Sequence, residues 1–206
     1  MKINRDKLLV AAFKLFMSVN YEKASFAELG KMLGMSKAGI FKYYKNKQEL
    51  FVAVVDKFWF STQNPRNKFA ETNGTFAEFI DEYVRGVQRT MDMLGDLLGL
   101  SREEVAEGKF TYHAQYFHFL FQLLQYDPDA KEKLQNLVTS DYAYWHAAIQ
   151  RAIDTGELKK DTDVEDAVVM FRQIYMGLSF EMAFLGGLDT KRLAKHLHAV
   201  YSLLKN

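Results

Sequence analysis

The chain has 206 residues, of which 49% are hydrophobic, and its formal net charge at pH 7 is +1. It contains no cysteine, which excludes disulfides and thiolate metal sites. No uncharged apolar run reaches the roughly 18 residues of a membrane span, and the N-terminus lacks the apolar region of a signal peptide. These features favour a soluble, cytoplasmic protein with ample material for a core and no membrane partner.

The charge is distributed unevenly along the chain. Residues 1–57 contain 11 Lys and Arg against 5 Asp and Glu, whereas the remainder contains 16 against 21. This asymmetry indicates a basic N-terminal head joined to an acidic body.

Apolar residues recur at helical spacing and the chain has only two prolines, which predicts an all-α fold of about nine or ten helices. Ser25, Thr75 and Ser101 each precede a glutamate by three positions, which is the pattern of a capping box. The expected helices span residues 3–19, 26–33, 37–43, 47 to just before Pro65, 76–98, 102–107, 110–126, 128–155, 164–186 and 190–204. The polar stretch 61–74 is expected to be a loop and the seam between head and body.

Two short helices are predicted at residues 26–33 and 37–43, joined by a turn at Gly34. This arrangement is the sequence form of a helix-turn-helix. Gly34 suits a turn residue with positive φ, and Ser36 can cap the second helix.

The second short helix has two different faces when its residues are placed at about 100° intervals. The inward face contributes to a small core expected from Leu29, Leu33, Ile40, Tyr44 and Leu50. The opposite face holds Ala38, Gly39 and Lys42, so little bulk separates its backbone from a DNA groove. A glycine inside a helix costs about 1 kcal/mol relative to alanine, and close approach to DNA would offset that cost.

The basic residues around this helix are placed for contact with double-stranded DNA. Lys37 and Lys42 can face base edges, and Lys47 lies at a helix N-terminus that favours phosphate. The residues expected to contact DNA are Ser25, Ser36, Lys37, Ala38, Gly39, Lys42, Tyr43 and Lys47. The alternative for the lysines is a solvated surface, and Ser25 can equally be only a cap. Phe41 can pack in the head or contact a thymine methyl group.

A resemblance to a known family rests on the run RDKLLVAAFKLFMSVNYEKASFAELGKMLGMSKAGIFKYYKNKQELF, residues 5–51. It closely resembles the DNA-binding head of TetR-family transcriptional regulators. The later run GELKKDTDVEDAVVMFRQIYMGL resembles the join between the last two long dimerisation helices of that family. The resemblance implies phosphate contacts from Ser25, Tyr43 and Lys47, and groove contacts from Lys37, Ala38, Gly39 and Lys42. Two departures from the family pattern are Asn20, where glycine is usual, and Phe41, where tyrosine is frequent.

Two domains are expected. A helix-turn-helix DNA-binding domain occupies residues 1–50, and a helical ligand-binding and dimerisation domain occupies residues 51–206. A helix at about 46–63 links them.

Heptad-like apolar stripes run along the last two long helices before the C-terminal one. The interface of a homodimer is expected to include Trp145, Ile149, Val168, Phe171, Tyr175, Leu178 and Met182. The stripes alone leave open that both face the chain's own core, and the family resemblance favours the dimer. A dimer would present two heads to a palindrome.

The run KFTYHAQYFHFLFQLLQY is apolar around most of its circumference, which indicates a helix in the middle of the body. Aromatic and Met walls with a few polar tips suit a pocket for a small apolar or aromatic effector. The pocket is expected from Phe58, Trp59, Met91, His113, Tyr116, Phe117, His118, Trp145 and Tyr175. Ordinary core packing is the alternative for each of them.

No catalytic, metal or cofactor site is expected. His113 and His118 are five residues apart, which departs from the i,i+4 spacing of a helical zinc site. The sequence therefore predicts a ligand-responsive transcriptional repressor that binds a palindromic operator as a dimer. The alternative is an all-α small-molecule-binding or enzymatic bundle without sequence-specific DNA recognition. The effector, the operator, the regulated genes and the choice between repressor and activator stay open.

Overall fold

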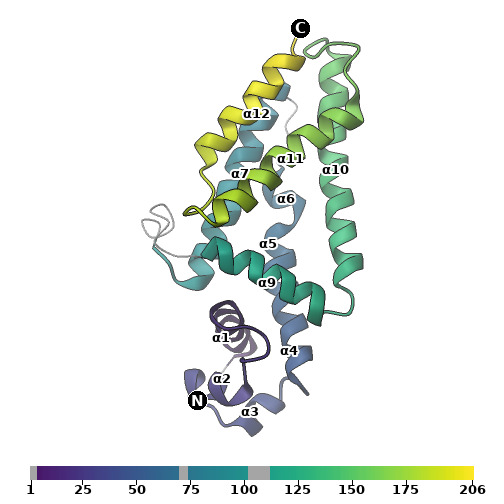
Figure 1. The fold of residues 1–206 in the computed structure, drawn as a ribbon. Helices are drawn as coiled ribbons and strands as arrows, with labels where there is room; N and C mark the ends of the chain where they lie inside the picture. The colour runs from purple at the N-terminus through teal and green to yellow at the C-terminus, as the bar shows by residue number, and fades with distance from the viewer. Residues whose placement is uncertain (1–3, 70–73, 102–111) are drawn as a thin grey trace.

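The computed structural model describes residues 4–69, 74–101 and 112–206, and over these residues it contains helices and no strand (Figure 1). The all-α prediction is confirmed. The elements are α1 Arg5–Ser18, α2 Phe26–Leu33, α3 Lys37–Phe41, α4 Lys47–Val54, the π-helix η1 Val55–Phe60, α5 Ser61–Gln63, α6 Pro65–Lys68, α7 Phe76–Leu98, α9 Tyr112–Tyr126, α10 Ala130–Asp154, α11 Val164–Ala183 and α12 Thr190–Leu204. The helix expected at 102–107 and the start of the one expected at 110–126 lie outside the described residues.

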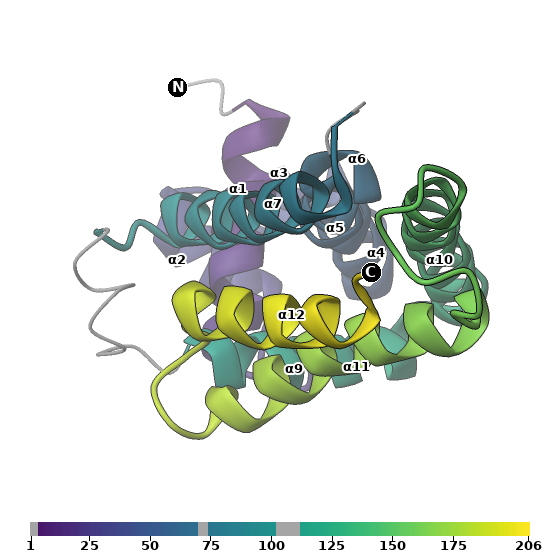
Figure 2. The same ribbon diagram turned by 90° about the horizontal axis from the view of Figure 1, so that it is seen from above.

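The head and the body lie at opposite ends of the molecule. Helices α1 to α3 form one end, while α7, α10, α11 and α12 form the other (Figure 1). In the body α12 packs along α7, and α11 packs against α10 (Figure 2). Helix α9 crosses between the two ends and contacts α1 and α4 on one side and α11 on the other.

Two clusters of buried apolar residues form the core. The first joins the head to η1 and α9, and includes Phe13, Phe51 and Phe119. The second lies between α7, α10, α11 and α12 around the fully buried Trp145. Packing in the first cluster therefore continues past residue 50, and α4, η1 and α5 form one continuous helical run over residues 47–63.

The prediction of a loop over residues 61–74 is wrong for Ser61–Gln63 and Pro65–Lys68, which form α5 and α6, whereas α5 agrees with the helix expected from residue 47 to just before Pro65. Asn64 caps α6 by accepting a hydrogen bond from the Arg66 amide at 3.0 Å, and Pro65 occupies the first helical position. Polar composition indicated a loop, but a capped proline start and packing against α7 stabilise a short helix here. Residues 70–73 lie outside the described part of the chain.

Candidate nucleic-acid interface and ligand cavity

The turn between α2 and α3 is built by two glycines. Gly34 ends α2 with φ of 63°, a left-handed conformation that favours glycine. The Met35 amide then donates to the Gly30 carbonyl at 2.8 Å. A Cβ on Gly30 would lie 2.6 Å from the Met35 carbonyl oxygen, so only glycine fits this close approach. The sequence pattern identified Gly34 but not Gly30. The atom that excludes a side chain at Gly30 is the Met35 carbonyl oxygen, which only the folded turn brings close.

The inward face of α3 packs as predicted. Ile40 and Tyr44 are buried with Leu29 and Leu50, and Leu33 packs against them. The Tyr44 hydroxyl accepts a hydrogen bond from Arg5 Nε at 3.0 Å. These contacts fix the rotation of α3, and they turn its opposite face to solvent.

The outward face of α3 carries the predicted groove residues. Lys37, Ala38 and Lys42 are exposed, and Ser36 caps the helix by accepting from the Gly39 amide at 3.1 Å. Gly39 is half-buried, and a Cβ added to it would lie 3.3 Å from Met35 Cε. Helix α3 ends at Phe41, two residues earlier than expected.

The flanking residues predicted to contact phosphate have other partners in the head. Ser25 caps α2 by accepting from the Glu28 amide at 3.2 Å. Lys47 Nζ donates to the Tyr21 carbonyl at 2.8 Å and lies 4.4 Å from the centre of that ring. Lys47 therefore joins the start of α4 to the segment between α1 and α2. Tyr43 is half-buried beside this surface.

Phe41 packs in the head on one side and is exposed on the other. Its ring is 45% exposed, and its other side meets the Phe26 ring at 4.9 Å between centroids. It packs in the head and also borders the outward face of α3.

A cavity of about 190 Å³ lies in the body, with walls from η1, α5, α6, α7, α9, α10 and α11. Five of the predicted pocket residues line it: Trp59, Met91, Tyr116, Phe117 and Tyr175. The remaining apolar walls come mainly from Leu94, Leu120, Leu134, Leu137 and Met176. Burial raises the pKa of the Tyr116 hydroxyl well above its ordinary value, with a smaller contribution from Tyr175.

Other predicted pocket residues lie elsewhere. Phe58 packs against Phe13 in the first core cluster, and Trp145 is stacked on Phe171 in the second. His118 is exposed. The side chain of His113 lies outside the described residues. An apolar helix has several buried faces, and periodicity does not tell which of them borders a cavity.

Three charged residues in the cavity wall were missed from the sequence. Lys68 is only 4% exposed, and its Nζ donates to Gln63 Oε1 at 2.9 Å. Arg172 and Asp141 also line the cavity, with Arg172 Nη2 at 4.0 Å from Asp141 Oδ2. Burial raises the pKa of the Asp141 carboxyl above its ordinary value, although Lys68 and Arg172 act in the opposite direction.

The residues expected at a dimer interface are mostly internal. Trp145, Ile149, Val168 and Phe171 are fully buried in the chain's own core, and Leu178 is buried as well. A second copy cannot contact the four side chains that are fully buried, so packing in the chain's own core, the alternative left open by the sequence, holds for those four. Tyr175 and Met182 are half-buried.

The described residues contain no group of three or more metal-ligating side chains. None of the helices described is long and apolar enough to cross a membrane.

Over the described residues, the geometry defines a helical protein with a helix-turn-helix at one end and a cavity of about 190 Å³ in the body. Residues 8–54 match the model for bacterial regulatory proteins of the tetR family, and residues 87–187 match the one for the tetracyclin repressor-like C-terminal domain. The chain therefore belongs to the TetR family of DNA-binding transcriptional regulators.

Solved structures of this family share the fold. MexZ, a repressor from Pseudomonas aeruginosa, is 20% identical with a TM-score of 0.63, covering 98% of this chain and 94% of its own. A Saccharomonospora viridis regulator in complex with choline is 16% identical with a TM-score of 0.65, covering 96% and 95%. The SmeT–triclosan complex is 16% identical with a TM-score of 0.62, covering 98% and 91%. No curated protein matches the chain.

Proposed function

We propose that this protein is a ligand-responsive repressor that binds a palindromic operator as a homodimer. The observation that carries the proposal is the outward face of α3, where Lys37, Ala38 and Lys42 are exposed beside a small glycine. Small residues let the helix backbone lie close to base edges, and the two lysines reach bases or phosphates. The family is a regulatory one, and we propose no catalytic activity for this member.

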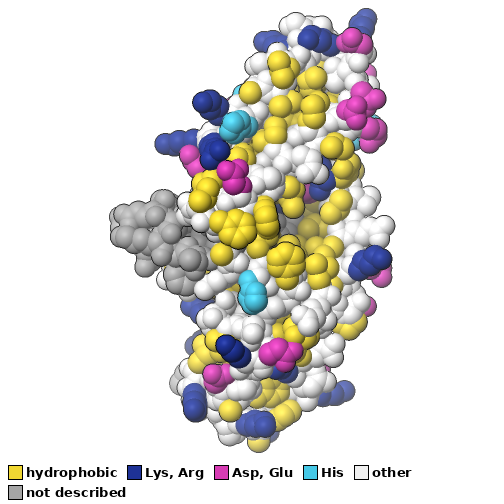
Figure 3. All heavy atoms as spheres, in the orientation of Figure 1, with side chains coloured by type: hydrophobic (Ala, Val, Ile, Leu, Met, Phe, Trp, Pro, Cys, Tyr) yellow, Lys and Arg dark blue, Asp and Glu magenta, His cyan; other side chains and the backbone are white. Residues whose placement is uncertain are grey.

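We propose that the dimer forms through the exposed side of α11. Val169, Met170, Met176 and Phe180 are each 40–48% exposed on this helix, and Phe184 just beyond it is 69% exposed. Figure 3 shows apolar side chains gathered where the C-terminal end of α11 approaches α9. Apolar patches of this kind are typical of protein–protein interfaces.

Helix α9 offers a path from the cavity to the head. Its middle turns line the cavity through Tyr116 and Leu120, and its last turns contact the head through Gln122 and Tyr126. Gln122 Oε1 accepts from the Tyr21 amide, and Gln48 Nε2 donates to the Tyr126 carbonyl at 3.2 Å. An effector that fits the DNA-released arrangement better would shift this helix and lower operator affinity. The choline and triclosan complexes of related folds support a small-molecule effector.

The test is selection of operator sequences from random double-stranded DNA with the purified protein at two salt concentrations. We expect a palindromic motif whose half-sites are about one helical turn apart. Lys42→Ala should weaken binding to that motif, whereas Lys195→Ala, exposed on α12 in the body, should leave it unchanged. Sequence-independent, purely salt-sensitive binding would contradict the proposal and favour a bundle without sequence-specific DNA recognition.

A further inference from the structure

We propose that the cavity binds an apolar monocarboxylate of the size of an aryl carboxylic acid, with its carboxylate paired to Lys68 and Arg172. This inference rests on the proposed function, because it names the effector class for the same cavity.

The charges in the cavity wall favour an anion. Among the residues described, the charged members of the wall are Lys68, Asp141 and Arg172, which gives two cations for one acid. Asp141 Oδ2 lies 4.0 Å from Arg172 Nη2, and the charges of both Lys68 and Arg172 act on the Asp141 carboxyl. Lys68 Nζ has the neutral Gln63 amide as its hydrogen-bond partner and the Tyr175 ring at 5.1 Å, and no described carboxylate lies within 4.0 Å of it. A buried ammonium that has no carboxylate within ion-pair distance is costly, and a ligand carboxylate would lower that cost.

Unpaired polar atoms in the wall point to the same chemistry. Arg172 Nε and Ser179 Oγ are buried with no hydrogen-bond partner, and both can donate. An ionised carboxylate only accepts hydrogen bonds, so it matches donors of this kind. Asp141 Oδ1 is an unpaired acceptor nearby.

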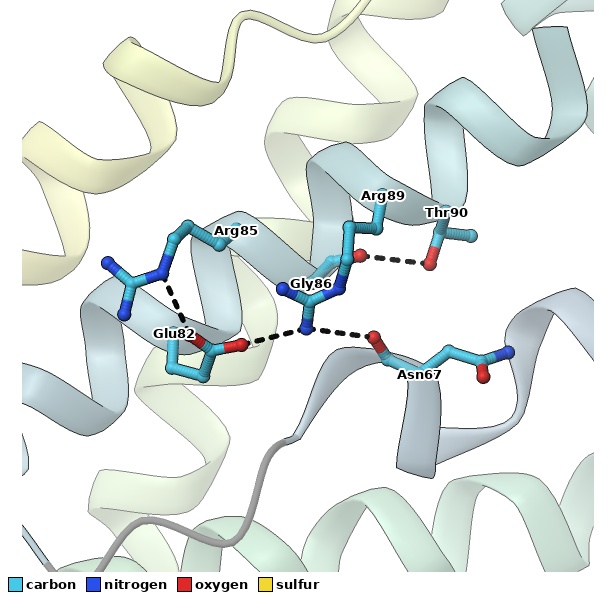
Figure 4. A network of polar contacts seen from close by, with 6 residues as sticks. All are labelled: Asn67, Glu82, Arg85, Gly86, Arg89 and Thr90. Atoms are coloured by element: carbon cyan, nitrogen blue, oxygen red, sulfur yellow. Dashed lines mark hydrogen bonds and ion pairs between the residues drawn. The ribbon is translucent and has the colours of Figure 1, made fainter. Parts of the chain in front are cut away.

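The position of Lys68 is fixed before any ligand enters. A Cβ on Gly86 would lie 2.4 Å from the Lys68 Cα, so glycine lets α6 contact the backbone of α7 directly. Arg89 then donates to the Asn67 carbonyl at 3.3 Å and to Glu82 at 2.8 Å (Figure 4). This network ties α6 to α7, and a positioned charge loses little freedom when it binds its partner.

The volume limits the size of the occupant. A dry apolar cavity of about 150 Å³ is known to hold benzene. The volume of about 190 Å³ found here, with walls such as Leu94, Leu120 and Leu137, suits a somewhat larger arene.

The test is calorimetric titration of the full-length protein with three probes of one shape. These are 2-naphthoate, the neutral 2-naphthamide and the cationic 2-naphthylmethylamine. We expect 2-naphthoate to bind at least tenfold more tightly than the amide, and the amine to bind most weakly. Lys68→Met, which keeps the apolar stem, should abolish the preference for the acid. The matched control Lys195→Met, on the exposed surface of α12, should retain it.

Equal affinity for the acid and the amide, or preference for the amine, would overturn the inference. Should Lys68→Met fail to fold, Arg172→Gln measures the same preference and should reduce it. Operator affinity is measured separately in the absence of probes. Intact operator binding without preference for the acid overturns this inference alone, whereas preference for the acid without operator binding supports it and contradicts the proposed function.

Discussion

The Tyr21 ring stacks on the Tyr126 ring with centroids 3.9 Å apart and planes 17° from parallel. Tyr21 follows α1 in the head, and Tyr126 ends α9, so this pair joins the DNA-binding end to the helix that lines the cavity. The Tyr126 hydroxyl also donates to Glu22. The last turn of α9 therefore contacts the segment that precedes α2 directly.

Tyr126→Ala should weaken coupling between the cavity and the head. Loss of the stack should lower the free energy of unfolding by about 1–3 kcal/mol, since aromatic pairs add to the area they bury. Operator release by an effector should become less complete. Chemical denaturation and an operator titration with and without effector measure both effects. Tyr126→Phe keeps the ring and should retain most of the coupling. If both variants lose the coupling equally, the coupling depends on the hydroxyl group and not on the ring.

Gly30→Ala should destabilise the head by about 1–3 kcal/mol, because the new Cβ would lie 2.6 Å from the Met35 carbonyl oxygen. Lys31→Ala is the control, because Lys31 is exposed on the same helix. That change should alter the free energy of unfolding by less than about 0.5 kcal/mol. Thermal and denaturant unfolding compare the two variants, and similar effects of both would show that the contact at Gly30 is relieved easily.

Lys42→Ala should weaken operator binding by about 1–3 kcal/mol if the side chain reads a base, with relaxed specificity at that position. Lys47→Ala should act differently, because its ammonium donates to the Tyr21 carbonyl in addition to the DNA contact proposed for it. It should lower both head stability and operator affinity. Salt-dependent binding together with unfolding measurements separates the two. Operator affinity unchanged in both variants would refute this DNA-binding surface.

Phe180→Glu should convert the dimer into a monomer, because a charge would replace an exposed aromatic ring at the proposed interface. Leu203→Glu is the matched control on α12, where the side chain is 71% exposed. It should leave the assembly unchanged. Sedimentation equilibrium measures both, and a dimer that tolerates Phe180→Glu would place the interface on another face.

Asp141→Asn should alter the pH dependence of stability. The raised pKa of this buried carboxyl means that its ionised form costs stability above that pKa and costs nothing well below the ordinary value of 3.8. The free energy of unfolding of Asp141→Asn relative to the unchanged protein should therefore increase as pH rises from below 3.8 towards neutrality. Denaturant unfolding over this range measures the difference. A difference that stays constant with pH would mean that the pKa of Asp141 is the same in the folded and unfolded states.

Local features of the sequence were sufficient for the head. Gly34 adopts a left-handed turn, and Ser25 and Ser36 accept amides from the first turns of the helices that they cap. Such constraints act over a few residues, so they can be read from spacing alone. The small core of α3 followed from the same short-range periodicity.

The body was decided by tertiary structure. Apolar periodicity shows that Trp145 and Phe171 are buried but does not tell against which helix, and they proved to lie inside the chain's own core. Lys68, Asp141 and Arg172 come from three helices far apart in the sequence and meet only because α6 packs on α7 at Gly86 and α10 on α11. A charge is solvated or buried according to its distant neighbours, and only the folded chain brings those neighbours together.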